Sequence, residues 1–323
     1  MVTPRCTVGV DFGGTNIRVG LVTDQGRVIR RVVLRTRDHA TPAAFVQGVR
    51  RAIDHLASHG GRRPNRIRGV RVGAPGLIDG RHGTVHELVN VPGGWRGVPL
   101  RRLLRQGLGR CCEVDNDANV VALGEWRLGA GRGTRDSLYL TLGTGVGGGI
   151  VSNGQLVRGA LGTAAELGHT LIDPRGPRCG CGRRGCLEAF VSTASVLRSA
   201  RLALRHGDRI LARIMTQSGG PLTPALVARA AAAGSRFSLE IWRQVGYHLG
   251  LGLASLIHTL NPERIILGGG MAGAFRLFRG GMREAIRARA FKAPAGAAQI
   301  VRAQLGDRAG IVGAAMLVWE GSG

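Results

Sequence analysis

Short apolar runs separated by glycine-containing turns open the chain. Residues 7–10 form a short apolar run, 17–22 and 27–34 resume the strand pattern, and turns at 11–15 and 24–26 separate the three segments, which predicts a meander of β-strands. Apolar residues at 45, 49, 52, 53 and 56 then follow a helical spacing. Thr41 is a plausible cap for that helix, Pro42 suits its first turn, and Gly60-Gly61 ends it.

Strand and helix patterns continue to alternate along the chain, which favours an α/β fold. Helices are expected from about 117 to 129 and from about 308 to 319, and the later half is mostly helical. Asn153-Gly154 is a hairpin signal. The further predicted strands are 67–72, 111–114, 137–142, 149–152, 264–267 and 299–301.

Two strand–turn segments resemble each other. One strand leads into Asp11-Phe12-Gly13-Gly14-Thr15, and another leads into Gly143-Thr144-Gly145 followed by Val146 and three more glycines. Glycine lets backbone N–H groups approach phosphate oxygens closely because no Cβ stands in the way. The pair predicts two duplicated domains that bind a polyphosphate, although one such loop alone would be an ordinary tight turn. Neither is a Walker A loop, since Gly-Lys-Ser/Thr is absent.

Composition and length narrow the class of protein. A chain of 323 residues predicts two domains. Its hydrophobic content of 44% and charged content of 20% exclude a disordered protein. No apolar run approaches the roughly 18 residues of a membrane span, and no secretory signal pattern precedes the first strand. We therefore expect a cytoplasmic protein that does not bind membranes.

The net charge of +25 comes almost entirely from arginine, since Lys292 is the only lysine. These arginines are scattered rather than gathered in one tract, which favours a solvated basic surface. Steering of polyanionic substrates and binding of nucleic acid are the alternatives.

An acidic and amide-rich run, Asp115-Asn116-Asp117-Ala118-Asn119, follows a predicted buried strand and begins a helix. Asp117 is the candidate acceptor for a proton from an alcohol during phosphoryl transfer, with Asn116 beside it to bind a hydroxyl. The alternative is that Asp115 or Asp117 only caps the helix. Asp11 is the candidate Mg²⁺ partner at the first glycine loop; the alternative is a turn-forming aspartate.

The segment from Glu166 to Glu188 carries the most specific local pattern. His169, Cys179, Cys181 and Cys186 form a Cys₃His set, which predicts a tetrahedral zinc site without an open position, hence a structural one. Free thiols in a loop are the alternative. Such a site would hold Glu166 and Glu188 rigidly, and each carboxylate could accept two hydroxyl hydrogen bonds from a sugar. Cys6, Cys111 and Cys112 show no such arrangement, and the last two fall in a predicted strand, where we expect them to be small core residues.

These segments together resemble the ROK family (repressor, open reading frame, kinase), and within it the ATP-dependent bacterial glucokinases. The resemblance covers nearly the whole chain. It rests on the two glycine loops, Gly73-Ala74-Pro75-Gly76, Asn116-Asp117-Ala118-Asn119, the 166–188 segment and Gly268-Gly269-Gly270. The 166–188 segment and the Asn-Asp-Ala-Asn run are the specific parts.

The resemblance implies a two-domain, actin-like (ribonuclease H-like) ATPase fold with an interdomain cleft. It implies one domain of residues 1–116 plus 300–323 and a larger one of 117–299. It also implies ATP and Mg²⁺ as cofactors with structural Zn²⁺, and a homodimer or homotetramer. Asp117 would be the base. The hexose would contact Gly76, Asn90, Asn116, Glu166, His169 and Glu188, and the nucleotide would contact Asp11, Gly13, Gly14, Thr15, Gly143, Thr144, Gly145, Gly269 and Gly270.

Several alternatives remain within and outside this class. The acceptor is glucose or another sugar: N-acetylglucosamine, N-acetylmannosamine, mannose or fructose. The donor is ATP or inorganic polyphosphate. ROK repressors carry a winged helix-turn-helix ahead of the first phosphate loop, and a loop at residue 11 leaves no room for one. A non-catalytic, sugar-sensing regulator is therefore the least favoured hypothesis.

Overall fold

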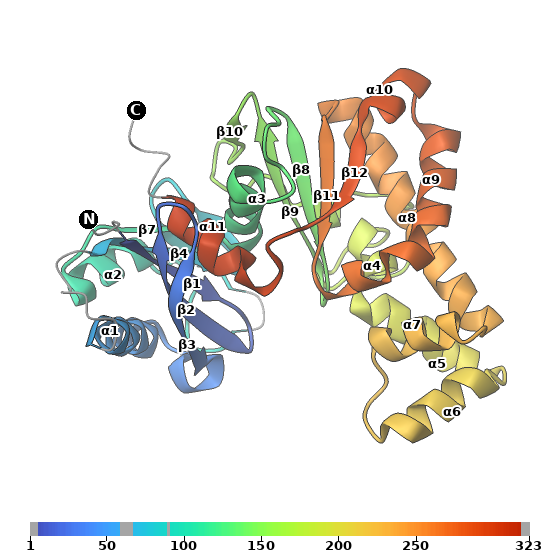
Figure 1. The fold of residues 1–323 in the computed structure, drawn as a ribbon, viewed down its shortest axis with the longest axis horizontal. Helices are drawn as coiled ribbons and strands as arrows, with labels where there is room; N and C mark the ends of the chain where they lie inside the picture. The colour runs from blue at the N-terminus through green and yellow to red at the C-terminus, as the bar shows by residue number, and fades with distance from the viewer. Residues whose placement is uncertain (1–5, 59–66, 89–90, 318–323) are drawn as a thin grey trace. The chain divides into compact units, whose positions relative to one another are not determined.

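The chain folds into two compact units, and the computed structural model describes residues 6–58, 67–88 and 91–317 of it (Figure 1). The first unit comprises residues 1–135, 149–165 and 303–323, and the second comprises 136–148 and 166–302. The helix that begins at Asp117 and the C-terminal segment from residue 303 both belong to the first unit.

The first unit contains a five-stranded sheet with the order β3-β2-β1-β4-β7. The antiparallel meander joins β1 (Cys6–Phe12), β2 (Asn16–Thr23) and β3 (Val28–Arg35), as predicted. Strands β4 (Ile67–Ala74) and β7 (Cys112–Asn116) continue the sheet in parallel with β1. A small hairpin pairs β5 (Leu77–Asp79) with β6 (Thr84–Glu87).

The second sheet repeats this topology with the order β10-β9-β8-β11-β12. Its hairpins join β8 (Ser137–Leu142), β9 (Val146–Ser152) and β10 (Gln155–Leu156). Strands β11 (Arg264–Gly268) and β12 (Gln299–Arg302) extend it in parallel with β8. Both sheets thus have a three-strand meander followed by two parallel strands, which confirms the duplication suggested by the two glycine loops.

Helices account for most of the remaining chain. The first unit holds α1 (Pro42–Ser58), α2 (Leu100–Leu108), α3 (Asp117–Leu128) and α11 (Ala309–Met316). The second holds α4 (Leu187–Val191), α5 (Thr193–Arg205), α6 (Arg209–Ser218), α7 (Pro224–Ala232), α8 (Arg236–Leu260), α9 (Phe275–Arg289) and α10 (Lys292–Ala297). Short 3₁₀ turns are η1 (Thr36–His39), η3 (Leu167–His169), η4 (Gly270–Ala274) and η5 (Gly306–Arg308).

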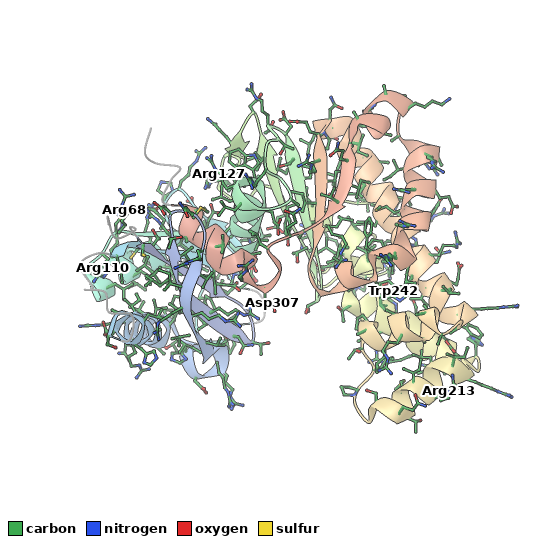
Figure 2. All side chains as sticks on the ribbon, in the orientation of Figure 1. Arg68, Arg110, Arg127, Arg213, Trp242 and Asp307 are labelled. Carbon is green, nitrogen blue, oxygen red and sulfur yellow. The ribbon has the colours of Figure 1, made fainter. Side chains whose placement is uncertain are left out.

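Exposed arginines lie on both units. Arg68 and Arg127 on the first unit and Arg213 on the second are exposed examples (Figure 2). Across the described part of the chain, no helix is both long and apolar enough to cross a bilayer.

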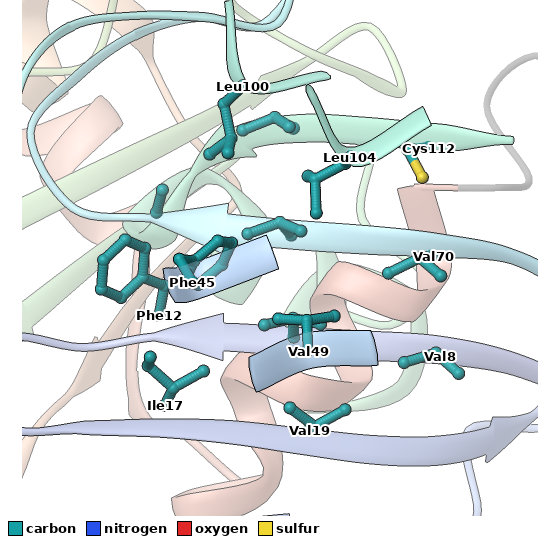
Figure 3. Close-up of a cluster of buried hydrophobic side chains, with 14 of the residues drawn as sticks. Val8, Phe12, Ile17, Val19, Phe45, Val49, Val70, Leu100, Leu104 and Cys112 are labelled. Atoms are coloured by element: carbon teal, nitrogen blue, oxygen red, sulfur yellow. The ribbon is translucent and has the colours of Figure 1, made fainter. Parts of the chain in front are cut away.

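The core of the first unit lies between its sheet and helices α1 and α2 (Figure 3). Phe12 and Phe45 stack with ring centroids 4.5 Å apart, and Trp95 lies 5.2 Å from Phe12. All three are almost fully buried, and burying each aromatic ring contributes about 1.5–3 kcal/mol. Since Phe12 is the last residue of β1, this packing fixes the position of the glycine loop that follows it.

Candidate active site

Three parallel strands of the first unit end at the same edge of the sheet. The register pairs Asp11 of β1 with Gly73 of β4, and Gly73 with Asp115 of β7. Ligands of α/β proteins bind beyond the carboxyl ends of parallel strands. The fold therefore brings the first glycine loop, the Gly73–Gly76 turn and the Asp115–Asp117 run to one edge.

Asn116 rather than either aspartate is the N-cap of α3. Its Oδ1 accepts the backbone N–H groups of Ala118 at 2.8 Å and Asn119 at 3.2 Å, and its Nδ2 donates to the carbonyl of Gly76 at 2.9 Å. Gly76 has φ +87°, and a Cβ there would overlap the carbonyl oxygen of Glu87, so only glycine fits. One amide side chain thus joins two of the predicted sugar-binding residues.

Asp117 occupies the first turn of α3 and is half-buried. Its Oδ1 accepts the N–H of Ala118 at 2.8 Å, which fixes the plane of the carboxylate. The sequence left open that Asp115 or Asp117 caps this helix. The structure shows that Asn116 is the cap instead.

Asp115 has a different environment from Asp117, because it is buried and 1% exposed. Its Oδ1 accepts the Asn116 N–H at 2.8 Å and the Asn119 amide at 3.0 Å, and its Oδ2 accepts Nε of Arg158 at 2.8 Å. Both oxygens of this carboxylate are occupied within the protein. The sequence pattern alone gave no signal for Arg158.

Asp11 ends β1 beside the first glycine loop and forms an ion pair with Arg18 at 3.0 Å. Burial raises the pKa of Asp11 above its ordinary value, and the charge and hydrogen bond of Arg18 oppose that rise. A Cβ on Gly310 of α11 would lie 2.5 Å from the Asp11 carboxyl carbon, so α11 closes over this side chain. A cation near Asp11 would favour its ionised form.

The glycine loops leave open space where side chains would stand. A Cβ built on Gly14, on Gly143 or on Gly270 would meet no atom within 4 Å. The first loop is closed by Gly13 N–H to Asn16 carbonyl at 3.0 Å, and Thr36 donates to the carbonyl of Gly13 at 2.7 Å. Packing does not require glycine at these three positions. We therefore assign their glycines to the close approach of a ligand to the loop backbone.

In the second unit, parallel pairing brings the second glycine loop next to the third glycine group. Gly268 pairs with Thr141, and Gly269 has φ +82°, where a Cβ would overlap the carbonyl oxygen of Leu142. Gly143 through Gly145 follow Leu142 directly. Gly143, Gly145, Gly269 and Gly270 therefore belong to one surface of this unit.

The Cys₃His set converges as the sequence predicts. The ligand atoms of His169, Cys179, Cys181 and Cys186 all lie within 4.8 Å of one another. Cys179 Sγ is 3.7 Å from His169 Nδ1, and Cys181 Sγ is 3.7 Å from Cys186 Sγ. With bonds of about 2.3 Å to sulfur and about 2.1 Å to nitrogen, the edges of a tetrahedral zinc site measure roughly 3.6–3.8 Å. These donors fit zinc.

The turn that holds this cluster depends on glycine at one position. Gly185 has φ +74°, and a Cβ there would overlap the carbonyl oxygen of Asp173. Burial raises the pKa of the Cys179 thiol to about 12, while the backbone N–H of Arg183 lowers that of Cys181. A cation bound at this cluster would favour the thiolate form of Cys179.

Glu188 lies between the cluster and the second glycine loop. One of its oxygens accepts the N–H of Val146 at 2.9 Å, and the other lies 3.2 Å from Cys179 Sγ. Burial raises the pKa of Glu166, with His169 opposing and Glu188 adding to the rise. Glu166, His169 and Glu188 thus belong to one electrostatic group in the second unit.

The predicted site residues are divided between the two units. Asp11, Gly13, Gly14, Thr15, Gly76, Asn116 and Asp117 lie on the first unit, and the other predicted residues that the structure describes lie on the second. Asn90 lies outside the described residues. Of the two cysteines expected in the core, Cys112 is buried as predicted, whereas Cys111 is exposed and that prediction is wrong; Cys6 is also buried.

Comparison with known proteins agrees with this arrangement. The ROK family matches residues 7–320 of the chain. The glucokinase of Thermotoga maritima is 37% identical over 315 residues, covering 97% of each chain. The glucokinase of Halalkalibacterium halodurans is 36% identical over 318 residues, covering 98% of this chain and 96% of the other. A Streptomyces griseus ROK glucokinase, solved with glucose and AMPPNP, superimposes with a TM-score of 0.82 at 33% identity over 97% and 98% of the two chains.

The fold and the site residues define a two-domain α/β kinase with the actin-like ATPase fold. The chain belongs to the ROK family.

Proposed function

We propose that this ROK kinase is an ATP-dependent glucokinase that converts glucose and ATP to glucose 6-phosphate and ADP. Its full-length relatives are named glucokinases at 36–37% identity. The observation that carries the proposal for the site is the contrast between Asp115 and Asp117. Both carboxylate oxygens of Asp115 accept hydrogen bonds within the protein. Asp117 is half-buried in the first turn of α3, and Asn116 caps that helix.

In the proposed reaction the glucose 6-hydroxyl oxygen forms a bond to the terminal phosphorus of ATP. The bond from that phosphorus to the bridging oxygen breaks, and ADP leaves with the electron pair. Asp117 accepts the hydroxyl proton, a contribution of about 10²–10⁴ in rate. Backbone N–H groups of the two glycine loops stabilise phosphate charge.

The remaining site residues divide between sugar and nucleotide. Glucose contacts Gly76, Asn90, Asn116, Glu166, His169 and Glu188 in this proposal. ATP contacts Gly13, Gly14, Thr15, Gly143, Thr144, Gly145, Gly269 and Gly270, with Mg²⁺ near Asp11. Mg²⁺ neutralises phosphate charge when it is bound.

The Cys₃His cluster is proposed to hold a structural zinc ion. Four protein ligands leave no position for a substrate, so the ion would act by fixing the loop that carries His169 and Glu188. Nδ1 of His169 lies 3.7 Å from Cys179 Sγ, which supports a role for Nε2 in binding a sugar hydroxyl.

Replacing the proposed base tests the mechanism. Asp117→Asn should lower kcat by at least about 10²-fold and leave the glucose dissociation constant within a few-fold, since the amide keeps the side-chain shape. Turnover is measured by ADP release, and glucose binding by calorimetry. Asp24→Asn removes an exposed aspartate of the same unit and serves as the control. Near-full kcat in Asp117→Asn would show that another group is the base.

The substrates are tested on the unmodified protein. Glucose, ATP and Mg²⁺ should release ADP well above the sugar-free control, and glucose should have the highest kcat/KM among glucose, mannose, fructose, N-acetylglucosamine and N-acetylmannosamine. A higher value for another sugar would reassign the acceptor. Phosphorylation of glucose by polyphosphate in the absence of ATP would reassign the donor. We also propose a cytoplasmic homodimer or homotetramer, which light scattering would test.

A further inference from the structure

The buried carboxylate beside the proposed base is neutralised by one arginine from a distant part of the chain. Arg158 Nε donates to Asp115 Oδ2 at 2.8 Å, and the two residues are 43 positions apart. The Asp115 side chain is 2% exposed and the Arg158 side chain 26% exposed. Without Arg158, Asp115 would be a buried charge whose remaining partners are neutral N–H groups, an arrangement that is costly in a protein interior.

Asp115 also fixes the backbone that presents Asn116 and Asp117. Its Oδ1 accepts the backbone N–H of Asn116 at 2.8 Å and the side-chain amide of Asn119 at 3.0 Å. Asn119 lies one turn further along the first part of α3 and is 1% exposed. The carboxylate therefore braces the turn on both sides of Asp117, and Arg158 is its only cationic partner among the described ion pairs.

Arg158 begins a loop that leads to Glu166. The N–H of Ala164 donates to the Arg158 carbonyl at 3.0 Å and closes the loop on itself. Gly162 has φ +76°, and a Cβ there would lie 2.9 Å from the backbone nitrogen of Gly80. A Cβ on Gly80 would in turn lie 3.2 Å from the Asp115 carboxyl carbon. The loop, the turn at Gly80 and the Asp115 carboxylate are thus in close contact with one another.

We infer that Arg158 is a positioning residue for phosphoryl transfer: its ion pair with Asp115 holds the Asn116–Asp117 turn in its reactive geometry and fixes the loop that precedes Glu166. The inference rests on the proposed role of Asp117. A displacement of about 1 Å at a reacting group can cost about 10²-fold in rate. Arg158 itself contributes through Asp115 and is not a catalytic residue.

Replacement of Arg158 should separate catalysis from nucleotide binding. Arg158→Met should lower kcat by about 10–100-fold while the KM for ATP stays within about twofold, because Arg158 acts through Asp115, which belongs to neither glycine loop. Arg158→Lys keeps the positive charge and should recover kcat to within about tenfold of the unmodified enzyme. Arg51→Met removes an exposed arginine from the same unit and is the matched control, with kcat unchanged.

A double-variant cycle separates positioning from simple stabilisation. Asp115→Asn combined with Arg158→Met removes both charges, so the thermal stability should exceed that of Arg158→Met alone. The double variant should lose no more kcat than the single variants do, since both act through one interaction. Amide hydrogen exchange in peptides covering 113–121 and 157–166 should be faster in Arg158→Met than in Arg51→Met.

The outcomes are distinguishable from failure of the proposed function. If the unmodified protein phosphorylates no sugar, the proposed function fails and hydrogen exchange alone tests the brace. Arg158→Met that is less stable but has unchanged kcat per folded molecule would overturn the positioning role. Exchange rates in both peptides that are equal in Arg158→Met and Arg51→Met would also overturn the positioning role. A multiplicative loss of kcat in the double variant would show that Arg158 acts independently of Asp115.

Discussion

Glu113 of β7 forms ion pairs with three arginines from other elements. Arg101 lies 2.7 Å from it, Arg105 2.9 Å and Arg71 3.2 Å. Burial alone would raise the pKa of Glu113, but the hydrogen bond and charge of Arg101, with the charges of Arg71 and Arg105, hold it below its ordinary value of 4.5. Arg71 is buried, and its Nε has no hydrogen-bond partner. Its charge therefore depends on this carboxylate.

Glu113→Gln should lower the free energy of unfolding by about 1–3 kcal/mol at pH 7, because it leaves Arg71 without its anionic partner. A depressed folded-state pKa means that the contribution is present above pH 4.5 and is lost as the pH falls through the folded value. The difference between the two proteins in urea unfolding should therefore shrink below pH 4.5. Glu284→Gln, in an exposed pair with Arg243, should cost at most about 1 kcal/mol. A pH-independent difference would contradict the assignment.

Helices α3 and α11 cross at a pair of glycines, which is why the helix that begins with Asp117 belongs to the first unit. A Cβ on Gly124 would lie 2.9 Å from the Cα of Gly313, and a Cβ on Gly313 would overlap the carbonyl oxygen of Val120. Val120, Leu123 and Ile311 are fully buried around this crossing. The close approach fixes the axis of α3 and therefore the position of its first turn.

Gly313→Ala should lower the free energy of unfolding by about 1–3 kcal/mol through overpacking. Gly280→Ala is the matched control, since a Cβ at that position of α9 would meet nothing within 4 Å. It should raise the free energy of unfolding by about 0.5–1 kcal/mol, the ordinary gain of alanine over glycine in a helix. Urea unfolding of both variants provides the comparison, and equal effects would show that the crossing tolerates a methyl group.

The proposed zinc site in the 166–188 segment can be tested by metal analysis and by removal of one ligand. Metal analysis should find about one zinc per chain, and Cys181→Ser should lose it because one tetrahedral ligand is removed. The melting temperature should fall on the order of 5 °C, and the glucose affinity should fall with it because Glu188 contacts Cys179. Cys111→Ser changes an exposed thiol outside the cluster and should change neither quantity. A zinc-free protein of full activity would exclude the structural role.

At the scale of the whole molecule, the charge of +25 is spread over both units (Figure 2). A field of this sign attracts an anionic nucleotide and has no effect on a neutral sugar. Raising the salt from about 0.02 to about 0.3 M shortens the screening length several-fold. The KM for ATP should therefore rise several-fold while the KM for glucose stays nearly constant. Steady-state kinetics at both salt concentrations measures this, and parallel changes in both constants would contradict it.

The strands of both sheets apart from β10 could be predicted from the sequence to within a few residues, since most of them are short apolar runs bounded by turn residues. Short elements such as β5, β6 and α2 were not predicted, because they carry too few apolar positions for a clear period. The Cys₃His set was predicted as a group, since its members lie within 18 positions of one another and a metal requires fixed spacing.

The sequence by itself determined the class of fold, the duplicated topology and the residue types available for chemistry, because periodicity and turn chemistry are local properties. Only the tertiary structure decided that Asp115 is buried among internal hydrogen bonds and that Asn116 caps α3. It also decided that Arg158 neutralises Asp115 and that α3 packs within the first unit. Those outcomes depend on contacts between segments tens to nearly two hundred positions apart, and no local pattern encodes such contacts.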